Sequence, residues 1–366
     1  MCMNGQQCLQ TLASSTLPAD VLLPGQLHSQ VQGFRLSSES LRRKHMVSAK
    51  VSCNEEADEK PIFSFGVITD VQYANIEDRC SFHGVPRFYR HSLEALQRAV
   101  RCWNERRDLS FIIHLGDIVD GYCPKEESYE VVTKVLDVFK ELQGLTVHHV
   151  LGNHCFYNLP RNELNNMLQI PSENGTSYYA FSPAPGFQII VLDGFDISVM
   201  GWPEGHPHRD EAIRLLEEKN PNEDKNSPEG LLDVEGRFVM FNGGVGKEQL
   251  SWLHQTLEEA TIRKEKAIIC CHIPLHPEVT LPCALLWNYA DVLDAIHKFP
   301  CVKLCLTGHA HTGGYTKDAH GVHHRSLEAI LECPPGSDAF GHIDVYDHHI
   351  SLVGVDRMES TDMLFD

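Results

Sequence analysis

Side chains that commonly bind metal ions follow five apolar segments of the chain. The segments are residues 63–69, 111–115, 146–151, 266–271 and 302–307. The polar residues that come after them are Asp70 and Gln72, then Asp117, then Asn153 and His154, then His272, and finally His309 and His311. A carboxylate at the end of a buried strand loses much of its hydration energy unless a cation or hydrogen-bond donors compensate for it. We therefore predict that these side chains hold divalent metal ions.

The predicted ligands are oxygen and imidazole donors without a cysteine, which argues against a structural zinc site. Seven ligands are too many for one ion that must also admit a substrate, whereas two ions that share Asp117 can use all of them. The assignment is Asp70, Gln72, Asp117 and His311 for one ion, and Asp117, Asn153, His272 and His309 for the other. Two ions about 3.5 to 4 Å apart activate a water molecule and neutralise phosphoryl oxygens. The predicted chemistry is metal-assisted hydrolysis at phosphorus.

His154 directly follows the predicted ligand Asn153. We predict that it acts as general acid on the leaving-group side, or stabilises charge on the phosphoryl group. The alternative is a histidine that supports the neighbouring ligand without touching substrate. Three other histidines, His114, His148 and His149, lie inside predicted strands and are expected to be core or sheet-face residues instead of ligands.

Strands and helices alternate in the first half of the chain. Residues 91–107 and 127–142 have helical apolar spacing, and each lies between two of the strand-like segments. Such alternation predicts a mainly parallel sheet with helices packed outside it. In open sheets of this class, binding sites form at the carboxyl ends of the strands. The five groups of polar residues are therefore expected to meet at one place.

A second sheet is predicted from the remaining strands. Residues 178–181 and 187–192 alternate with turn-rich sequence, and residues 341–346 and 350–355 flank the turn of a hairpin. Two sheets, each with helices on its outer face, define an α/β protein with a four-layer α/β/β/α sandwich. This is the fold class that we expect.

The 366 residues, of which 42% are hydrophobic and 22% charged, suit one catalytic domain. We predict that this domain spans residues 59–358 and contains an insertion at 197–242. Residues 1–58 are rich in serine and arginine and poor in acids, as in an organellar transit peptide or a disordered extension. Residues 359–366 are expected to be a frayed tail.

Charge and cysteine content limit the partners. The formal net charge of −19 makes nucleic acid or an anionic membrane an unfavourable partner, and no apolar stretch is long enough to span a membrane. The 13 cysteines have no repeating spacing, which indicates reduced thiols. We expect an intracellular monomer, located in the cytoplasm, or in a plastid if residues 1–58 are a transit peptide.

An ordered set of motifs resembles the calcineurin-like metallophosphoesterase superfamily over residues 61–356. The motifs are Asp70-x-Gln72, Gly116-Asp117-x-x-Asp120, Gly152-Asn153-His154, His272 and Gly308-His309-x-His311. The resemblance implies a metallophosphoesterase-type sandwich with a binuclear metal site. Leu151 stands where protein Ser/Thr phosphatases carry an arginine, and Asp120 stands where purple acid phosphatases have a tyrosine. Both of these branches are therefore disfavoured.

The Gln72 variant of the first motif, with Tyr-Arg-His-Ser at 89–92 and Trp-Asn-Tyr at 287–289, resembles the manganese-dependent ADP-ribose/CDP-alcohol diphosphatases. The resemblance implies a small-molecule nucleotide diphosphate as substrate: ADP-ribose, or a CDP-alcohol such as CDP-choline or CDP-glycerol. Cleavage of the pyrophosphate bond would give a nucleoside monophosphate and a phosphorylated sugar or alcohol. The implied cofactors are two divalent cations, with Mn²⁺ preferred over Mg²⁺.

Substrate specificity is expected in the loop at residues 82–90 and in the insertion after Asp196. Phe82 is predicted to stack on the nucleotide base, and Arg87 to pair with the second phosphate. The alternative is a solvent-exposed aromatic and basic loop. Two other functions stay open: a cyclic-nucleotide or phosphoprotein phosphoesterase of the same superfamily, and a non-catalytic scaffold that keeps the fold.

Overall fold

The computed structural model describes residues 59–81, 84–173 and 175–365 of the chain. Asp58–Asp366 form one compact unit. The predicted extension at residues 1–58 and the predicted base-stacking residue Phe82 lie outside the described residues. Within the described ranges, no helix is both long enough and apolar enough to cross a membrane.

The first sheet has six strands in the order β14-β13-β12-β1-β4-β5. The strands are β1 (Phe63–Ile68), β4 (Leu109–His114), β5 (Thr146–His149), β12 (Phe340–Val345), β13 (His349–Gly354) and β14 (Thr361–Leu364). β1 pairs with β4 and β4 with β5 in parallel, whereas β12 runs antiparallel to β1. The carboxyl ends of the three parallel strands therefore lie at one edge of the sheet.

The second sheet also has six strands, in the order β10-β11-β9-β8-β7-β6. The strands are β6 (Tyr179–Phe181), β7 (Phe187–Val191), β8 (Lys266–Cys270), β9 (Val302–Thr307), β10 (Thr312–Lys317) and β11 (His323–Glu328). The four central strands are parallel, and the edge strands β6 and β10 are antiparallel to their neighbours. This sheet also gathers its parallel carboxyl ends at one edge.

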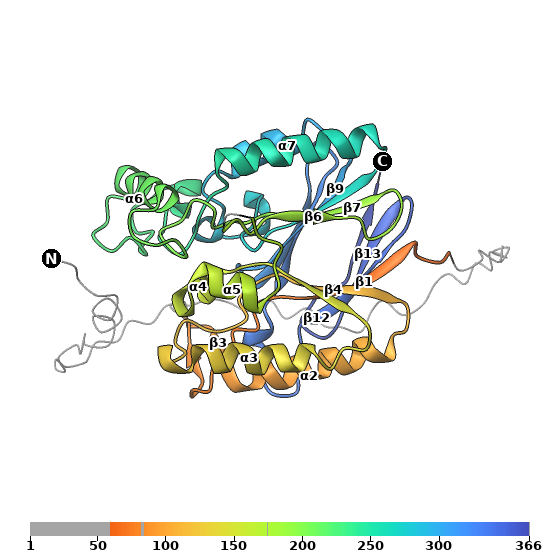
Figure 1. Cartoon of the computed structure of the whole chain (residues 1–366), viewed down its shortest axis with the longest axis horizontal. Coiled ribbons are helices and arrows are strands. Elements are labelled where there is room, and N and C mark those ends of the chain that lie inside the picture. The colour runs from red at the N-terminus through yellow and green to blue at the C-terminus, as the bar shows by residue number, and fades with distance from the viewer. Residues whose placement is uncertain (1–58, 82–83, 174, 366) are drawn as a thin grey trace, which may run out of the picture. The chain divides into compact units, whose positions relative to one another are not determined.

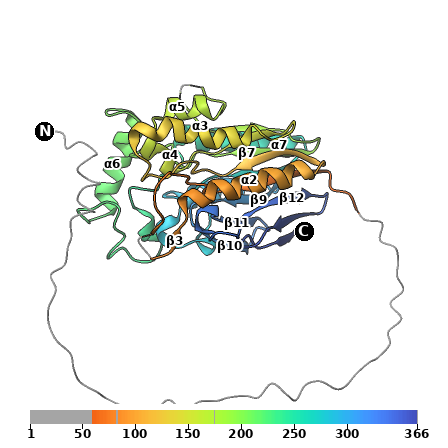
Figure 2. The same ribbon diagram turned by 90° about the horizontal axis from the view of Figure 1, so that it is seen from below.

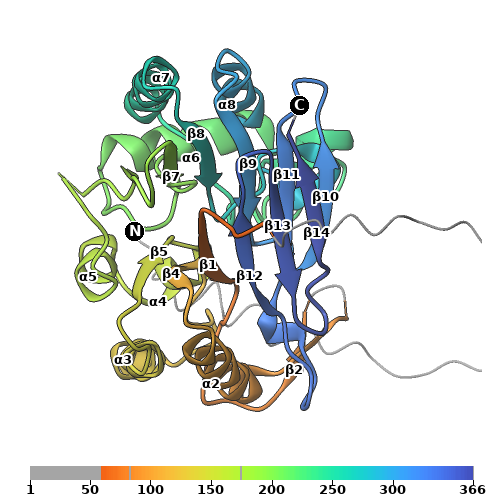
Figure 3. The same cartoon turned by 90° about the vertical axis from the view of Figure 1, so that its right-hand side faces the viewer.

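Helices cover the outer faces of the two sheets. Figures 1 and 3 show α2 (Tyr89–Glu105) and α3 (Ser128–Phe139) on one side, and Figure 3 shows α7 (Lys247–Ile262) and α8 (Tyr289–Ile296) on the opposite side. The apolar stripe predicted for residues 91–107 faces inward, because Leu93, Leu96, Val100 and Trp103 are buried. The predicted four-layer α/β/β/α sandwich is thereby confirmed.

Aromatic side chains fill the space between the sheets. Phe65 of β1 stacks on Phe111 of β4 at a ring-centroid distance of 4.9 Å. Phe63 meets Phe187 of the second sheet edge-on at 5.3 Å. Burial of these rings removes a large apolar area from water and holds the two sheets together.

The remaining elements lie toward one end of the sandwich. They are the two-stranded β2 (Arg79–Cys80) and β3 (Pro86–Arg87), and the helices α4 (Asn153–Asn158), α5 (Arg161–Met167) and α6 (Pro207–Lys219). Figures 1 and 2 show that α6, in the predicted insertion, and β3 lie at this same end. The short 3-10 helices are η1 (Lys125–Glu127), η2 (Asp233–Arg237), η3 (Pro277–Val279), η4 (Pro282–Ala284) and η5 (Ile330–Glu332).

The C-terminal residues differ from the frayed tail that we expected at 359–366. Thr361–Leu364 form β14, which pairs antiparallel with β13. Met363 lies opposite Ile350 in this ladder, and both side chains are fully buried. The prediction is wrong for these four residues, which pair with β13 along their whole length and bury Met363.

Candidate metal centre

Contacts of about 3 Å connect four of the predicted ligands. The Nε2 atom of Gln72 lies 3.2 Å from Asp70 Oδ1, 3.2 Å from Asp117 Oδ2 and 3.0 Å from His311 Nε2. His311 Nε2 lies 3.2 Å from Asp70 Oδ1. This half of the predicted binuclear set, which joins the ends of β1, β4 and β9, is thus brought together.

The other half gathers around the same Asp117. Its Oδ2 lies 3.3 Å from His272 Nε2, and ligand atoms of Asp117, His272 and His309 all lie within 4.8 Å of one another. The backbone N–H of His154 donates to Asp117 Oδ1 at 2.8 Å, which anchors the first turn of α4 and with it the side chain of Asn153. Asp117 therefore lies at the junction of both sets, as predicted for a shared ligand.

Five of the predicted ligands have a left-handed backbone conformation. They are Asp70, Gln72, Asp117, His309 and His311, with φ between 39° and 63°. Side-chain-bearing residues rarely adopt this conformation, and it persists only where the surroundings enforce it. Backbone hydrogen bonds provide that enforcement: Asp70 N–H donates to Gly116 O at 3.0 Å, and Gly308 N–H donates to His272 O at 2.9 Å.

Two glycines allow the ligand loops to approach one another. A Cβ atom on Gly152 would lie 2.1 Å from Asp117 Oδ1, and one on Gly116 would lie 2.4 Å from His272 Nδ1. Gly116 also has a φ of 108°, which side-chain-bearing residues avoid. The glycines of the Gly-Asp and Gly-Asn pairs are therefore needed for packing around Asp117.

Each site histidine is oriented by an acceptor on one ring nitrogen. His272 Nδ1 donates to the carbonyl of Leu115 at 2.7 Å, and His311 Nδ1 donates to Glu332 Oε1 at 2.9 Å. His309 Nε2 donates to Asn242 Oδ1 at 2.8 Å. Because each of these oxygens accepts a hydrogen bond, the proton of the neutral ring lies on the donating nitrogen and the opposite nitrogen has a lone pair, which is the tautomer that a metal ligand requires.

Several buried atoms of this centre have no hydrogen-bond partner. They include Gln72 Oε1, Asn153 Oδ1 and His272 Nε2. Each atom can supply a lone pair to a cation, and leaving it buried and unpaired would cost free energy. The donor set of oxygens and imidazole nitrogens thus fits divalent cations such as Mn²⁺ and Mg²⁺.

The electrostatics of the centre suit a cation. Burial raises the pKa of Asp70 and Asp117, but the neighbouring histidines outweigh burial, and the pKa of each carboxyl group lies below its ordinary value. Burial lowers the pKa of His309 to about 3. For His311, burial lowers the pKa, but Asp70 and Glu332 outweigh it and raise the pKa to about 9. The two carboxylates are ionised at neutral pH and present two negative charges to a metal.

His154 lies at the margin of the centre with 16% of its side chain exposed. Its Nδ1 accepts from the backbone N–H of Gly121 at 2.9 Å and lies 3.1 Å from Asp120 Oδ2. Asp120 is buried, and its Oδ2 has no hydrogen-bond partner. The imidazole can therefore be held by Gly121 when it is neutral and by Asp120 when it is protonated.

Arg87 belongs to β3, and its Nε atom is buried without a partner. Burial, Asp70 and Glu332 have larger effects on the pKa of His311 than Arg87 has. The charge of Arg87 lowers the same pKa. The guanidinium group thus lies within electrostatic range of the ligands. The position of Phe82 stays a prediction, because that residue is not described.

Three residues of the centre received no role from the sequence: Asp120, Asn242 and Glu332. Asp120 lies within a recognised motif, so its spacing from Asp117 was an available signal. Glu332 had no such signal, because 21 residues separate it from His311 and no motif surrounds it. Two of the histidines excluded as ligands contact each other, with His114 Nδ1 and His149 Nδ1 3.2 Å apart in the core.

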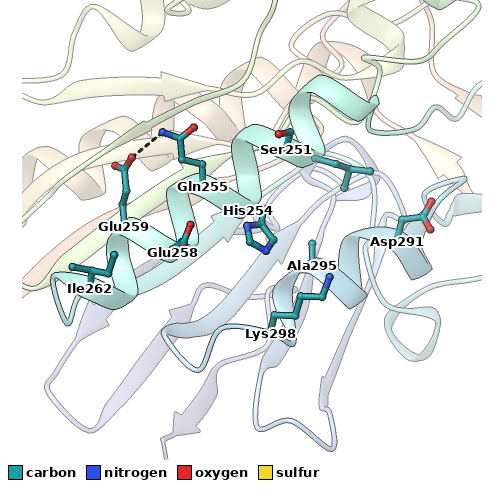
Figure 4. Close-up of a pocket in the computed structure, with 10 residues that line it drawn as sticks. Ser251, His254, Gln255, Glu258, Glu259, Ile262, Asp291, Ala295 and Lys298 are labelled. Carbon is teal, nitrogen blue, oxygen red and sulfur yellow. Dashed lines mark hydrogen bonds between the residues drawn. The ribbon is translucent and has the colours of Figure 1, made fainter.

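One groove on the outside of the sandwich lies away from this centre. It is a groove of about 730 Å³ between α7 and α8, lined by residues that include His254, Glu258 and Lys298. Figure 4 shows His254 and Glu258 on α7 and Lys298 just past the end of α8, with a hydrogen bond between Gln255 and Glu259. None of the predicted ligands lines it.

Comparison with known proteins agrees with this fold. The calcineurin-like phosphoesterase family matches residues 63–313, and the chain belongs to this family. The superfamily predicted from the motifs is thereby confirmed.

The chain is similar to proteins named manganese-dependent ADP-ribose/CDP-alcohol diphosphatase. It is 56% identical to the one from Arabidopsis thaliana over 84% of this chain and 98% of that protein, and 40% identical to the human one over 81% and 91%. A crystal structure of a dimetal phosphatase from Danio rerio matches with a TM-score of 0.80 and 35% identity, over 84% of this chain and 100% of that one. The narrower resemblance seen in the sequence is also confirmed.

Proposed function

We propose that this chain is a hydrolase that cleaves the pyrophosphate bond of ADP-ribose and of CDP-alcohols such as CDP-choline and CDP-glycerol. The products are a nucleoside monophosphate and a phosphorylated sugar or alcohol. The observation that carries the proposal is the convergence of carboxylate, amide and imidazole groups on Asp117, in a chain whose relatives carry this activity in their names.

The proposed ligands are Asp70, Gln72, Asp117 and His311 for one cation and Asp117, Asn153, His272 and His309 for the other. Two bound cations supply Lewis acidity, which activates water and offsets the charge on phosphoryl oxygens. The protein contributes fixed histidine tautomers, two ionised carboxylates and a backbone that holds the ligands in place.

His154 is the proposed general acid. In its neutral form, Nδ1 accepts from Gly121, so the ring proton is on Nε2. Once protonated, the ring can donate from Nδ1 to Asp120 Oδ2 and can transfer its Nε2 proton to the leaving phosphoryl oxygen, which leaves a neutral ring with its proton on Nδ1. The buried carboxylate would thus stabilise the charged imidazole between successive proton transfers.

The test is a substrate panel on the purified full-length chain with Mn²⁺ or Mg²⁺. We expect release of AMP from ADP-ribose and of CMP from CDP-choline, with little hydrolysis of a cyclic nucleotide or a phosphopeptide. The variant Asp117→Asn, which removes the shared carboxylate charge, should lose activity on every substrate. Preferential hydrolysis of the cyclic nucleotide or the phosphopeptide would replace the proposal with another phosphoesterase activity. No hydrolysis at all would favour the scaffold.

Manganese preference is proposed to depend on Gln72. A carboxamide oxygen is a weaker donor than an imidazole nitrogen, so the amide changes the field at one cation relative to the histidine found in most of the superfamily. The ratio of turnover with Mn²⁺ to turnover with Mg²⁺ should change in Gln72→His. An unchanged ratio of the two rates would count against this role.

Residues 1–58 are proposed as a separate N-terminal segment, either a plastid transit peptide or an extension of a cytoplasmic enzyme, with the catalytic domain beginning near residue 59. The described cysteines are all free, which supports a reducing compartment. We propose that the enzyme is a monomer. Imaging of fluorescent fusions with and without residues 1–58, and the mass in solution, test these two points.

A further inference from the structure

The segment after β11 is tied to two of the ligand loops. Ala329 N–H donates to the carbonyl of His311 at 3.1 Å, and Leu331 N–H donates to the carbonyl of Asp70 at 3.2 Å. These bonds hold η5 against both ligands. The last residue of η5 is Glu332, whose side chain is 4% exposed.

The carboxylate of Glu332 lies between the imidazole of His311 and the guanidinium group of Arg357. Its Oε1 accepts from His311 Nδ1 at 2.9 Å, and its Oε2 accepts from Arg357 Nη2 at 2.7 Å. Arg357 comes from the loop between β13 and β14, and its Nη2 also lies 3.4 Å from the carbonyl of His311. Two independent contacts therefore fix Glu332, and the imidazole of His311 has an anionic acceptor.

His309 has a neutral acceptor instead. Asn242 is fully buried, and its Oδ1 accepts from His309 Nε2 at 2.8 Å. The amide nitrogen of Asn242 donates to three carbonyls, those of Arg237, Cys283 and Leu285, at 2.9, 2.9 and 3.2 Å. These bonds determine which end of the amide faces His309, so the tautomer of that histidine is fixed without adding charge.

We propose that Glu332 and Asn242 are positioning residues that set different affinities for the two cations. This inference rests on the ligand assignment of the proposed function, in which His311 and His309 belong to different cations. A carboxylate that accepts from a ligating imidazole raises its basicity and strengthens the metal bond. Glu332 thus strengthens binding of the cation that is held with Gln72, whose amide oxygen is a weak donor. Asn242 only orients His309 and does not strengthen its bond to the other cation.

The test uses Mn²⁺ binding to the metal-free full-length chain, measured by electron paramagnetic resonance of free Mn²⁺ without substrate. The wild type should bind two ions. Glu332→Gln keeps the size and an acceptor oxygen but removes the charge. We expect the affinity of one Mn²⁺ to fall by about 10- to 100-fold, with the other affinity changed by less than about 3-fold.

The control variant is Glu328→Gln. Glu328 also forms a buried ion pair, with Arg325 Nη2 at 2.8 Å, on the adjoining strand β11, but it has no hydrogen bond to a site histidine. Loss of this ion pair in Glu328→Gln should leave both Mn²⁺ affinities unchanged. An equal loss of affinity in the two variants would overturn the proposal, because it would mean that removing any buried ion pair nearby has the same effect.

A double-mutant cycle tests whether Glu332 acts through His311. In the His311→Gln background, Glu332→Gln should cause no further loss of affinity. Additive losses of affinity in the double variant would overturn the proposal. Unchanged binding of both ions in Glu332→Gln, or equally weakened binding of both, would also overturn it. So would a wild-type protein that binds fewer than two ions. Thermal unfolding of each metal-free variant identifies any that do not fold. If Glu332→Gln does not fold, Glu332→Met, which also removes the charge and has a similar size, replaces it.

The proposed activity and the positioning role of Glu332 can be refuted independently of each other. If the Mn²⁺ titrations give the expected pattern but no nucleotide diphosphate is hydrolysed, the positioning role stands without the substrate assignment. If ADP-ribose is hydrolysed but Glu332→Gln binds both ions like the wild type, the positioning role alone is overturned.

Discussion

At the scale of single residues, the centre combines strained backbone with fixed side chains. Asp117 shows both features, since its φ is 57° and its carboxylate lies 3.3 Å from His272 and 3.2 Å from Gln72. A residue in such a position has few alternative conformations. Small changes next to it should therefore affect function more than stability.

Gly152 tests this point. Its φ of −119° suits any residue, so Gly152→Ala adds no backbone strain, but the new Cβ would lie 2.1 Å from Asp117 Oδ1. We expect at least about a 100-fold loss of kcat/KM, because a 1 Å displacement of a catalytic group has effects of this size. Mn²⁺ titration and initial rates on ADP-ribose measure it.

The control is Gly144→Ala, where φ is 74° and nothing lies within 4 Å of the added Cβ. It should cost about 1 to 2 kcal/mol of stability and leave kcat/KM unchanged. If Gly152→Ala keeps full activity, the close packing around Asp117 is not needed for function.

Arg87 is the residue proposed to bind the second phosphate. Its Nε is buried without a partner and its charge reaches the ligands. Arg87→Ala should lower kcat/KM for ADP-ribose by about 10- to 100-fold, the effect of losing a charge-assisted hydrogen bond. Arg101→Ala, an exposed arginine of α2, should leave it unchanged. Wild-type KM and kcat in Arg87→Ala would remove Arg87 from the site.

At the scale of elements, strand ends bring the ligands together. Backbone hydrogen bonds continue past the strands, for example from Gln72 N–H to Asp117 O at 2.8 Å and from Gly308 N–H to His272 O at 2.9 Å. The loops after β1 and β4, and those after β8 and β9, therefore support one another. A strand contributes to the site through its neighbours as well as through its own ligand.

Strand β5, which leads to Asn153, contains two histidines that remain neutral. Burial lowers the pKa of His148 to about 4, and that of His149 falls well below its ordinary value because of burial and the neighbouring histidines. His148 stacks on Phe181 at 3.8 Å. The pKa of each histidine is lower in the folded protein than in the unfolded chain. The contribution of the neutral histidines to stability is therefore complete above about pH 6.5 and is lost as the pH falls toward 4.

We therefore predict that His148→Phe reduces the loss of stability in acid. Between pH 7 and pH 5 the free energy of unfolding should fall by about 1 kcal/mol less than in the wild type, a value discounted for the partial exposure of His148. Urea unfolding with a chelator present measures the free energy of unfolding of both proteins. The difference between them at pH 7 gives the effect of the substitution on packing and is subtracted from the difference at pH 5. Parallel pH profiles would show that His148 binds protons in the folded protein as well.

At the scale of the whole molecule, local sequence determined what could be predicted. Asp117 and His311 each follow a buried strand within a few residues, so pattern and spacing were enough to predict the layered fold and to select side chains that the fold brings together. The contact of Glu332 with His311 and the burial of Met363 depend on distant segments that meet only in the folded chain. No local pattern encodes them, which is why the acceptor of His311 and the strand β14 were missed.

The two sheets contribute to one centre, and this links metal binding to the stability of the whole sandwich. Asp70, Asp117 and Asn153 follow strands of the first sheet, whereas His272, His309 and His311 follow strands of the second. Bound cations would therefore connect the sheets at the edge where their parallel strands end. Any ligand bound only by the folded state adds stability in proportion to its saturation.

Removal of metal should consequently destabilise the entire domain. At a free Mn²⁺ concentration 100 times the dissociation constant, the gain is about 2.7 kcal/mol for each ion, so the midpoint of thermal unfolding should fall by several degrees when a chelator replaces Mn²⁺. The Asp117→Asn variant, which weakens the ligand shared by both ions, should show a much smaller difference. Equal midpoints with and without Mn²⁺ in the wild type, or the same shift in Asp117→Asn, would mean that the two sheets are not joined through Asp117.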